Sequence, residues 1–345
     1  MVARKAWIPS QGTFYAEQTS SPYDPTTGRI FNDSQQPHEI DAKDDGKDRS
    51  AEFDRSRIPR DLEEFLKVAS LANIAVVQQN AEQQWEAQGD PTEIAIQVFA
   101  ARFDYNRTRL TSGDKPLWIQ KAEFPFDSDV KKMSVIYEDA ASGQNFVFTK
   151  GAVERVIGSC TSILTKDGAE PEAVTEATRE NIIANMEAIA ASGLRVLALA
   201  SRPYTGVVNE GDDIDRNEVE KDLTFRGLIG LYDPPRPESA PAVALCHEAG
   251  ITVHMLTGDH PSTARSIAAD VGIVPADMDK LAKDTADSMV MTAQQFDSLT
   301  DEQIDRLPVL PLVVARCTPN TKVRMIEALH RRKRFAAMVC LLLLD

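Results

Sequence analysis

From residue 223 onward, short apolar segments alternate with segments that have helical periodicity. The predicted strands are residues 223–233, 251–256, 309–317 and 334–344, and the predicted helices between them are residues 238–250, 261–272 and 321–332. The strands are apolar along their whole length, which is typical of a parallel sheet with helices on both faces. The alternation therefore predicts that residues 226–345 form a doubly wound α/β domain.

The preceding residues, 1–225, have the mixed pattern of an α+β domain. Helical spacing begins at Leu62, and a second helix is predicted after Asp90-Pro91, where Asp90 is a suitable cap. A helix is also predicted at about 173–192, and strands at 117–126, 131–139, 144–152 and 195–204, the second and third joined as a hairpin. Residues 18–60 are polar and aperiodic, so we expect a long loop or a disordered insertion there.

Composition excludes several classes of function. Acidic residues outnumber basic ones by 53 to 38, which gives a formal charge of −15 and makes nucleic-acid binding across a broad surface unexpected. The four cysteines form no CxxC pair, which favours reduced thiols over a zinc site or disulfides. No apolar run approaches the roughly 20 residues that a membrane-spanning helix needs. We therefore expect no membrane segment in this sequence.

Thr257, Gly258 and Asp259 stand at the end of a predicted strand, just before a predicted helix. In a doubly wound sheet, ligands bind beyond the carboxyl ends of the strands, where a hydroxyl and free helix N–H groups suit a phosphoryl oxygen. A plain turn is the simpler interpretation of three residues considered alone. In that case Gly258 is needed for the turn and Asp259 caps the helix.

Three further positions allow two interpretations each. Lys322 falls in the first turn of a helix capped by Thr318 or Asn320, so it either reaches an anion beyond the strand ends or is a solvated lysine. Arg236 pairs with a phosphate or an acidic partner, or it is a surface arginine on a rigid linker. Phe126 stacks on a nucleotide base, or it is an ordinary core residue.

Two interpretations also apply to Lys131 and Lys150, which the nucleotide interpretation groups with Phe126. Lys131 follows Phe126 by five residues, and Lys150 stands beside a glycine turn. In the nucleotide interpretation both lysines face the phosphates. In the alternative they are surface lysines on a hairpin.

Taken together, these segments are much more specific than any one of them. In order and spacing they resemble the cytosolic part of P-type cation-transporting ATPases, on the motifs TKGA (149–152), LRVLALA (194–200), DPPR (233–236), MLTGDHPSTA (255–264) and RCTPNTKVRMIEAL (316–329). The segments AWIPSQGTFY and EALHRRKRF resemble most the fungal sodium- or potassium-exporting group, with calcium pumps next.

The resemblance implies a nucleotide-binding domain at 1–225 and an incomplete haloacid-dehalogenase-like phosphorylation domain at 226–345. Phe126 would stack on adenine, and Arg236 would help to hold the two domains closed. The implied nucleotide-binding residues are Glu93, Phe126, Lys131, Lys150, Gly151, Arg195, Arg236, Thr257, Gly258, Asp259 and Lys322. Of these, Thr257, Asp259 and Lys322 are the catalytic candidates, and no metal ligand is expected.

The implied function is ATP-driven export of sodium or potassium by a plasma-membrane pump, with this region on the cytoplasmic face and the remaining pump domains as partners. Two family motifs do not occur in this sequence: DKTGTLT, whose aspartate is phosphorylated, and TGDGVND, whose acidic residues hold Mg²⁺. We therefore expect the isolated chain to be soluble and cytoplasmic, to bind ATP and not to hydrolyse it.

Two other functions were weighed against this one. A binding or interaction module without nucleotide affinity remains open as the alternative. A soluble phosphatase of the haloacid-dehalogenase class is disfavoured, because its chemistry needs the same missing aspartate. In relatives the segment with that aspartate supplies a central strand, so residues 226–345 are expected to be less stable than residues 62–225.

Overall fold

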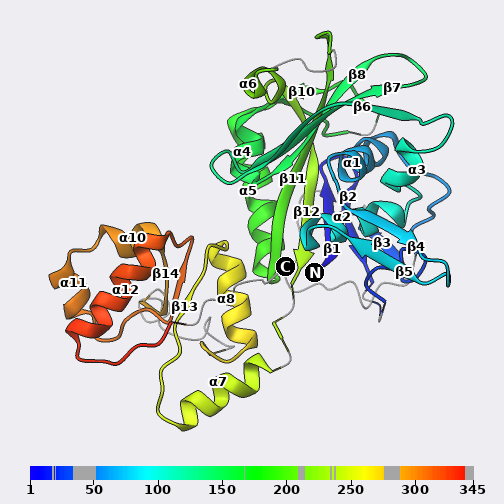
Figure 1. Cartoon of the computed structure of the whole chain (residues 1–345). Helices are drawn as coiled ribbons and strands as arrows, with labels where there is room; N and C mark the ends of the chain where they lie inside the picture. Colours follow the sequence, from blue (N-terminus) through cyan, green and yellow to red (C-terminus); the bar gives the residue numbers. More distant parts are fainter. Residues whose placement is uncertain are drawn as a thin grey trace. The chain divides into compact units, whose positions relative to one another are not determined.

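The computed structural model describes residues 1–17, 19, 21–33, 52–166, 168–208, 214–233, 235–236, 238–275 and 288–338. The chain divides into two compact units, whose elements are labelled in Figure 1. The first unit comprises residues 1–190 and 194–234, and the second comprises residues 191–193 and 235–345.

A large sheet is the framework of the first unit. Its ten strands among the described residues are β1 (Val2–Ile8), β2 (Gly12–Ala16), β3 (Ile30–Asp33), β6 (Trp118–Asp127), β7 (Lys132–Asp139), β8 (Asn145–Gly151), β9 (Cys160–Ile163), β10 (Glu172–Ala173), β11 (Leu194–Tyr204) and β12 (Leu223–Tyr232). The main path runs β3-β2-β1-β12-β11-β8-β7-β6, and every neighbouring pair on it is antiparallel. Strand β9 lies parallel to β12.

Helices cover both faces of this sheet. Helices α1 (Arg60–Leu71) and α2 (Pro91–Ala101) pack on one face, and α4 (Val153–Gly158) and α5 (Glu176–Ala191) pack on the other. Because successive side chains of a strand point to opposite faces, one strand serves both cores. On β7, Val135 and Tyr137 join the core of α1 and α2, whereas Ile136 joins the core of α4 and α5.

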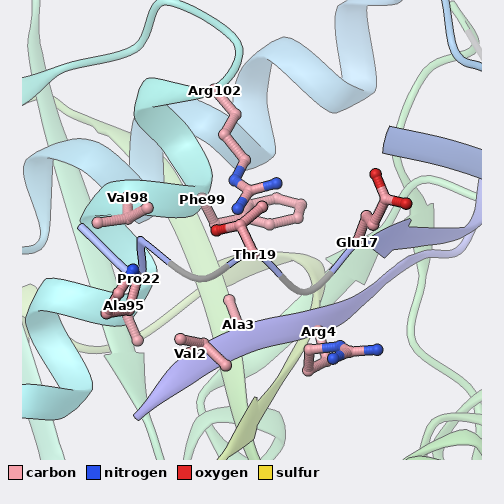
Figure 2. A pocket seen from close by; sticks show the side chains of 10 residues that line it. All are labelled: Val2, Ala3, Arg4, Glu17, Thr19, Pro22, Ala95, Val98, Phe99 and Arg102. Atoms are coloured by element: carbon pink, nitrogen blue, oxygen red, sulfur yellow. The ribbon is translucent and has the colours of Figure 1, made fainter. Parts of the chain in front are cut away.

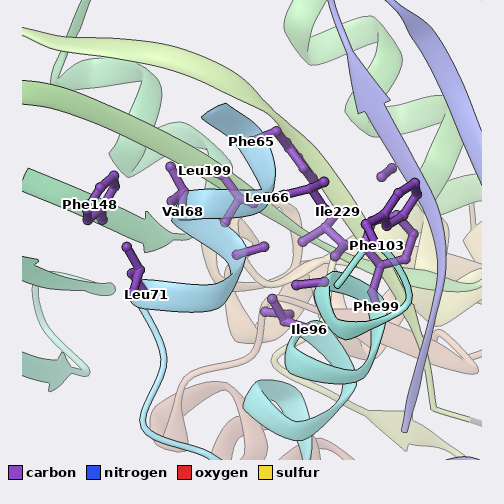
Figure 3. Close-up of a cluster of buried hydrophobic side chains, with 14 of the residues drawn as sticks. Phe65, Leu66, Val68, Leu71, Ile96, Phe99, Phe103, Phe148, Leu199 and Ile229 are labelled. Carbon is purple, nitrogen blue, oxygen red and sulfur yellow. The ribbon is translucent and has the colours of Figure 1, made fainter. Parts of the chain in front are cut away.

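Helices α1 and α2 are stabilised by the apolar core that they share with the sheet. Figure 3 shows their apolar side chains meeting the sheet, with Phe65, Leu66, Val68 and Leu71 from α1, Ile96 and Phe99 from α2, and Phe148, Leu199 and Ile229 from the strands. Each fully buried side chain of this size contributes roughly 1.5–3 kcal/mol. Asp90 accepts hydrogen bonds from the N–H groups of Thr92 and Glu93, which confirms the predicted cap of α2.

The remaining elements of the first unit are short. They are β4 (Val76–Gln79) and β5 (Trp85–Gln88), which pair as a separate hairpin, together with α3 (Arg107–Thr111) and α6 (Arg216–Val219). The predicted hairpin of residues 131–139 and 144–152 is confirmed as β7 and β8. Within the predicted loop of residues 18–60, residues 30–33 instead form β3, and residues 34–51 lie outside the described residues.

One strand lies in a different sheet from the one expected. The apolar segment 223–233 was predicted to begin the parallel sheet, but β12 lies in the antiparallel sheet between β1 and β11. The physical reason is that the first sheet also has helices on both faces. A strand at its centre is therefore apolar along its whole length, as a parallel strand is.

The second unit has a small parallel sheet. Strands β13 (Met255–Leu256), β14 (Val290–Thr292) and β15 (Val313–Ala315) run in the order β13-β15-β14. The described helices around it are α7 (Ser239–Glu248), α8 (Pro261–Asp270), α10 (Ala293–Ser298), α11 (Asp301–Arg306) and α12 (Pro319–Arg331). Val313 and Ala315 face α8, and Val314 faces the core of α10, α11 and α12, so the predicted doubly wound α/β pattern is confirmed.

The strands of this unit are shorter than the sequence predicts. Of the apolar run 251–256, only Met255 and Leu256 pair with β15. Pro311, which precedes β15, has no N–H group and cannot extend the ladder toward residue 251. Residues 334–338 also form no strand, and the rest of the segment predicted there, 339–344, lies outside the described residues. Among the described helices, none combines the length and apolar composition that a membrane crossing requires.

We expect the second unit to open more easily than the first. Helix α7 has no buried residue, and in the described part of the chain β13 is paired on one side only. Few buried contacts and an open strand edge both lower the free energy of local opening. Native-state hydrogen exchange on the whole chain should therefore show weaker protection in β15 and α12 than in β11 and β12. Equal protection of the two pairs would contradict this expectation.

Candidate functional site

A buried ion pair joins α2 to the sheet of the first unit. Lys150 on β8 donates from Nζ to Oε1 of Glu93 at 2.6 Å. The other carboxylate oxygen, Oε2, accepts the backbone N–H of Ile74 at 3.1 Å. Both side chains are almost fully buried, with residue exposures of 8% for Glu93 and 6% for Lys150. Two sequence-predicted site residues are thus in direct contact.

The burial of Lys150 changes its electrostatics. Desolvation lowers the pKa of the Lys150 ammonium, and the attraction of Glu93 opposes that shift. The expectation that Lys150 is a surface lysine is therefore wrong. Its charge is held inside the fold chiefly by Glu93, and removal of that carboxylate leaves the buried cation without its directly bonded partner.

Phe126 lies near the end of β6, and Lys131 lies in the turn between β6 and β7. Phe126 is 63% exposed, so the expectation of a core phenylalanine is also wrong. The carboxylate of Asp127 accepts the N–H groups of Asp129 at 2.7 Å and Val130 at 3.2 Å, and these bonds lower its pKa. Lys131 closes the turn with φ of +58°, and its side chain is exposed. An aromatic ring and a cation are thus both accessible at this end of the hairpin.

Gly151 follows Lys150 on β8 and lies against the backbone of Lys131 in this turn. The N–H of Ala152 donates to the carbonyl oxygen of Lys131 at 3.0 Å. A Cβ atom at position 151 would collide with that oxygen and with the Cα of Lys132. Glycine is therefore required here because two backbones approach closely. As a result Lys131, Lys150 and Gly151 lie at the same end of two adjacent strands.

Arg195 stands apart from this group, and Arg236 belongs to the second unit. Arg195 is an exposed residue of β11, three positions before Ala198, which faces Gly151. At the usual rise of a strand, that offset is about 10 Å along the sheet. It lies beyond the end of β8. Arg236 is exposed in the second unit, where its carbonyl oxygen accepts the N–H of Ser239.

In the second unit, Thr257 and Asp259 form a closed turn after β13. The Thr257 hydroxyl donates to Oδ2 of Asp259 at 2.7 Å and accepts the Asp259 N–H at 3.1 Å. The expected cap role of Asp259 is wrong, because His260 is the cap of α8 and accepts the N–H of Ser262. Gly258 does not have a positive φ, and a Cβ there would meet nothing within 4 Å. The turn itself therefore does not require a glycine.

The segment that precedes Lys322 is bonded to this turn. The N–H of Cys317 donates to the carbonyl of Thr257 at 2.8 Å, and that of Arg316 donates to the carbonyl of Asp259 at 3.1 Å. Helix α12 then begins with Thr318 as its cap, and Lys322 is half-buried in its first turn. Burial raises the pKa of the Cys317 thiol, and the charge of Lys322 opposes the shift. The ends of β13 and β15 thus bring the predicted phosphoryl contacts onto one edge of the sheet.

A second buried polar group was not predicted from the sequence. Glu220, only 5% exposed, accepts from Lys132 at 2.9 Å, from Ser134 at 2.7 Å and from Arg216 at 2.8 Å. The only local signal is the spacing of Arg216 and Glu220 by four residues, which is also common in solvated helical pairs. The contacts with Lys132 and Ser134 join residues that are far apart in the sequence.

None of the predicted site residues lines the cavity in Figure 2. This cavity lies in the first unit beside β1 and α2, with Arg102, Val98 and Glu17 among its walls. In the part of the chain that the structure describes, no group of three or more His, Cys, Asp or Glu side chains is arranged to hold a metal ion.

The Glu93–Lys150 pair makes a testable contribution to stability. We expect Glu93→Gln to lower the free energy of unfolding of the first unit by about 3–5 kcal/mol, because the Lys150 charge stays buried without a partner. The three tryptophans, Trp7, Trp85 and Trp118, all belong to this unit, so urea unfolding followed by tryptophan fluorescence measures its stability.

The control is a more exposed ion pair of the same sheet. Lys121 and Glu138 are in contact at 2.7 Å with side chains 29% and 28% exposed. Glu138→Gln should cost less than about 1 kcal/mol, because solvent screens the pair. Equal losses in the two variants would show that burial of the Glu93–Lys150 pair has no special energetic weight.

Comparison with known proteins agrees with these motifs. Residues 61–238 match the family model for the cytoplasmic domain N of P-type ATPases, and residues 183–339 match the model for haloacid dehalogenase-like hydrolases. The chain is 43% identical to sodium/potassium exporting P-type ATPase 2 of Saccharomyces cerevisiae, over 98% of the chain and 34% of that protein.

Two further relatives extend the comparison. Identity is 45% to the sodium/potassium exporting P-type ATPase cta3 of Schizosaccharomyces pombe, over 98% of the chain and 31% of that protein. It is 34% to the cation-transporting ATPase pma1 of a Synechocystis strain, over 81% of the chain and 28% of that protein. The chain spans about a third of the length of the relatives it matches best here. On the family model and these identities, the chain belongs to the P-type ATPase family.

Proposed function

We propose that this chain is the ATP-binding cytosolic region of a P-type ATPase that couples ATP hydrolysis to export of sodium or potassium. The ion is inferred from the fungal relatives, which are sodium/potassium exporting P-type ATPases. In this proposal residues 1–225 bind the nucleotide, residues 226–345 contact the phosphoryl group, and the remaining pump domains are the partners. The pump itself acts in a plasma membrane, with this region on its cytoplasmic face.

The observation that carries the proposal is the exposed ring of Phe126. A phenylalanine that is 63% exposed buries little of its ring, and this one lies at the end of β6, next to the turn that presents Lys131. An exposed aromatic face beside a cation fits a purine base with its phosphates. The residues present therefore suit ATP at the shared end of β6, β7 and β8.

Lys150 has a supporting role in this proposal. Its ammonium is bonded to Glu93, so it places a buried positive charge below the site and leaves the phosphates to Lys131 and Arg195. The ion pair needs no reorganisation on binding, because both of its side chains are already held in place. Glu93 sets the position of that charge through its own bond to Ile74.

The second unit supplies the contacts for the transferred phosphate. Thr257, Asp259 and Lys322 are the residues proposed here, because the bonded turns after β13 and β15 bring them to one edge of the sheet. At Gly258 the space open to a Cβ leaves room for a phosphoryl oxygen to approach the backbone. Arg236 is proposed to help hold the nucleotide-bound arrangement.

Members of the family use ATP and Mg²⁺. The motifs that would supply the phosphorylated aspartate and the Mg²⁺ ligands, DKTGTLT and TGDGVND, do not occur in residues 1–345. When bound, Mg²⁺ neutralises charge on the phosphates. We therefore propose that these residues bind ATP and release no phosphate from it by themselves.

Titration of ATP by calorimetry tests the adenine contact. We expect Phe126→Ala to weaken ATP binding by roughly tenfold, since stacking of a base on an aromatic ring is worth about 1–3 kcal/mol. Because the ring is exposed, the same change should leave the unfolding free energy within about 0.5 kcal/mol of the original.

Leu117→Ala is the matched control, since Leu117 is 56% exposed and precedes the other end of β6. It should leave ATP affinity unchanged. Equal affinity of the original chain and Phe126→Ala would overturn the adenine assignment. No ATP binding at all would favour an interaction module without nucleotide affinity, and measurable phosphate release would contradict the proposal of binding alone.

A further inference from the structure

The pairing of β6 with β7 is irregular just before the turn that carries Lys131. It shifts register between Phe124 and Asp127, so the regular ladder is interrupted on both sides of Phe126. Pro125, within that interval, has no N–H group to donate. Contacts from outside the two strands can therefore add order to this end of the hairpin.

The side chain of Arg216 supplies contacts to both arms of the turn. Its Nη2 donates to the carbonyl oxygen of Lys132 at 2.5 Å, and its Nη1 donates to the carbonyl oxygen of Pro125 at 3.3 Å. Pro125 is the residue before Phe126, and Lys132 is the residue after Lys131. One planar guanidinium thus spans the segment that carries both proposed ligand contacts.

Glu220 fixes the position of that guanidinium. Its Oε1 accepts from Nε of Arg216 at 2.8 Å and from Ser134 at 2.7 Å, and its Oε2 accepts from Lys132 at 2.9 Å. Ser134 in turn is bonded to Thr149 on β8. Because the carboxylate is buried and bonded on both oxygens, it anchors the arginine to two strands of the sheet.

We propose that Arg216 is a positioning residue for nucleotide binding, which acts by holding the β6–β7 turn and with it Phe126 and Lys131. The inference rests on the proposed function of this turn. A turn that is ordered before the ligand arrives loses less entropy on binding, so the affinity is higher. Arg216 itself does not touch the nucleotide in this role.

The experiment compares Arg216→Met and Arg216→Lys with Arg202→Met. Arg202 donates to the carbonyl oxygens of Glu218 and Val219, so it also binds the α6 segment, but these bonds do not reach the β6–β7 turn. A lysine at position 216 keeps the positive charge near Glu220. Its ammonium lacks the two separated N–H groups with which the guanidinium bonds the carbonyl oxygens of Pro125 and Lys132. Arg216→Lys therefore serves as the variant that preserves the fold.

Two measurements are made on each variant of the full chain. ATP affinity, measured by calorimetry, should fall about tenfold for both changes at position 216 and remain within twofold for Arg202→Met. In the Phe126→Ala background, the further loss from Arg216→Lys should be smaller than in the original chain, because the residue acts in part through that ring and in part through Lys131. Hydrogen exchange of the Asp129, Val130 and Lys131 amides without ATP should quicken about tenfold in the variants at position 216.

The outcomes separate this inference from the proposed function. If the original chain binds ATP and Arg216→Lys binds it equally well, the positioning role is overturned and the proposed function stands. Equal losses of affinity in Arg202→Met and the variants at position 216 would also overturn it. If the original chain binds no ATP, the proposed function fails, and positioning of a nucleotide fails with it. If amide hydrogen exchange in the turn is unchanged in both variants at position 216, Arg216 does not order the turn, and the positioning role is overturned whatever the ATP affinities are.

Discussion

The antiparallel pairing of β11 with β12 is the constraint on which the first unit depends. Both strands lie inside the sheet, with β1 on the far side of β12 and β8 on the far side of β11. Their backbone groups are satisfied on two sides, and their side chains pack on two faces. The register that sets Ala198 opposite Gly151 then fixes where β8 ends, and the next pairing sets Lys132 opposite the same glycine. The location of the candidate site follows from hydrogen bonds made at the middle of the sheet.

The hairpin of β7 and β8 also carries one buried lysine to each of its faces. Lys150 meets Glu93 from α2 on one face, and Lys132 meets Glu220 on the other. Each lysine is neutralised by a carboxylate from a distant segment, so neither charge is left alone in the interior. Because adjacent strands direct these two side chains to opposite faces, the end of the hairpin is restrained on both sides. An exposed aromatic ring such as that of Phe126 can hold one orientation only if the backbone that carries it is restrained.

Local patterns predicted much of this fold. Asp90 followed by Pro91 predicted the start of α2, and the apolar alternation predicted the β7–β8 hairpin, because both signals depend only on near neighbours. The sheet to which β12 belongs could not be predicted, since burial on both faces gives the same apolar pattern in either sheet. At the site, the residue types and the motif spacing predicted a set of candidate side chains, two of which, Glu93 and Lys150, are in contact. They did not predict the burial of Lys150 or the bonds of Arg216, which join residues 84 and 91 positions apart.

Gly151 has a consequence for how this surface can vary. The carbonyl of Lys131 occupies the space that any side chain at position 151 would take, so this position admits no larger residue without moving β7 from β8. The exposed side chains of Phe126 and Lys131 have no such neighbour constraint at their tips. If the proposed nucleotide contacts are correct, changes of ligand preference are expected at those two exposed positions, and Gly151 of β8 is expected to stay the same. The close backbone contact is then a constant part of a surface whose exposed side chains can change.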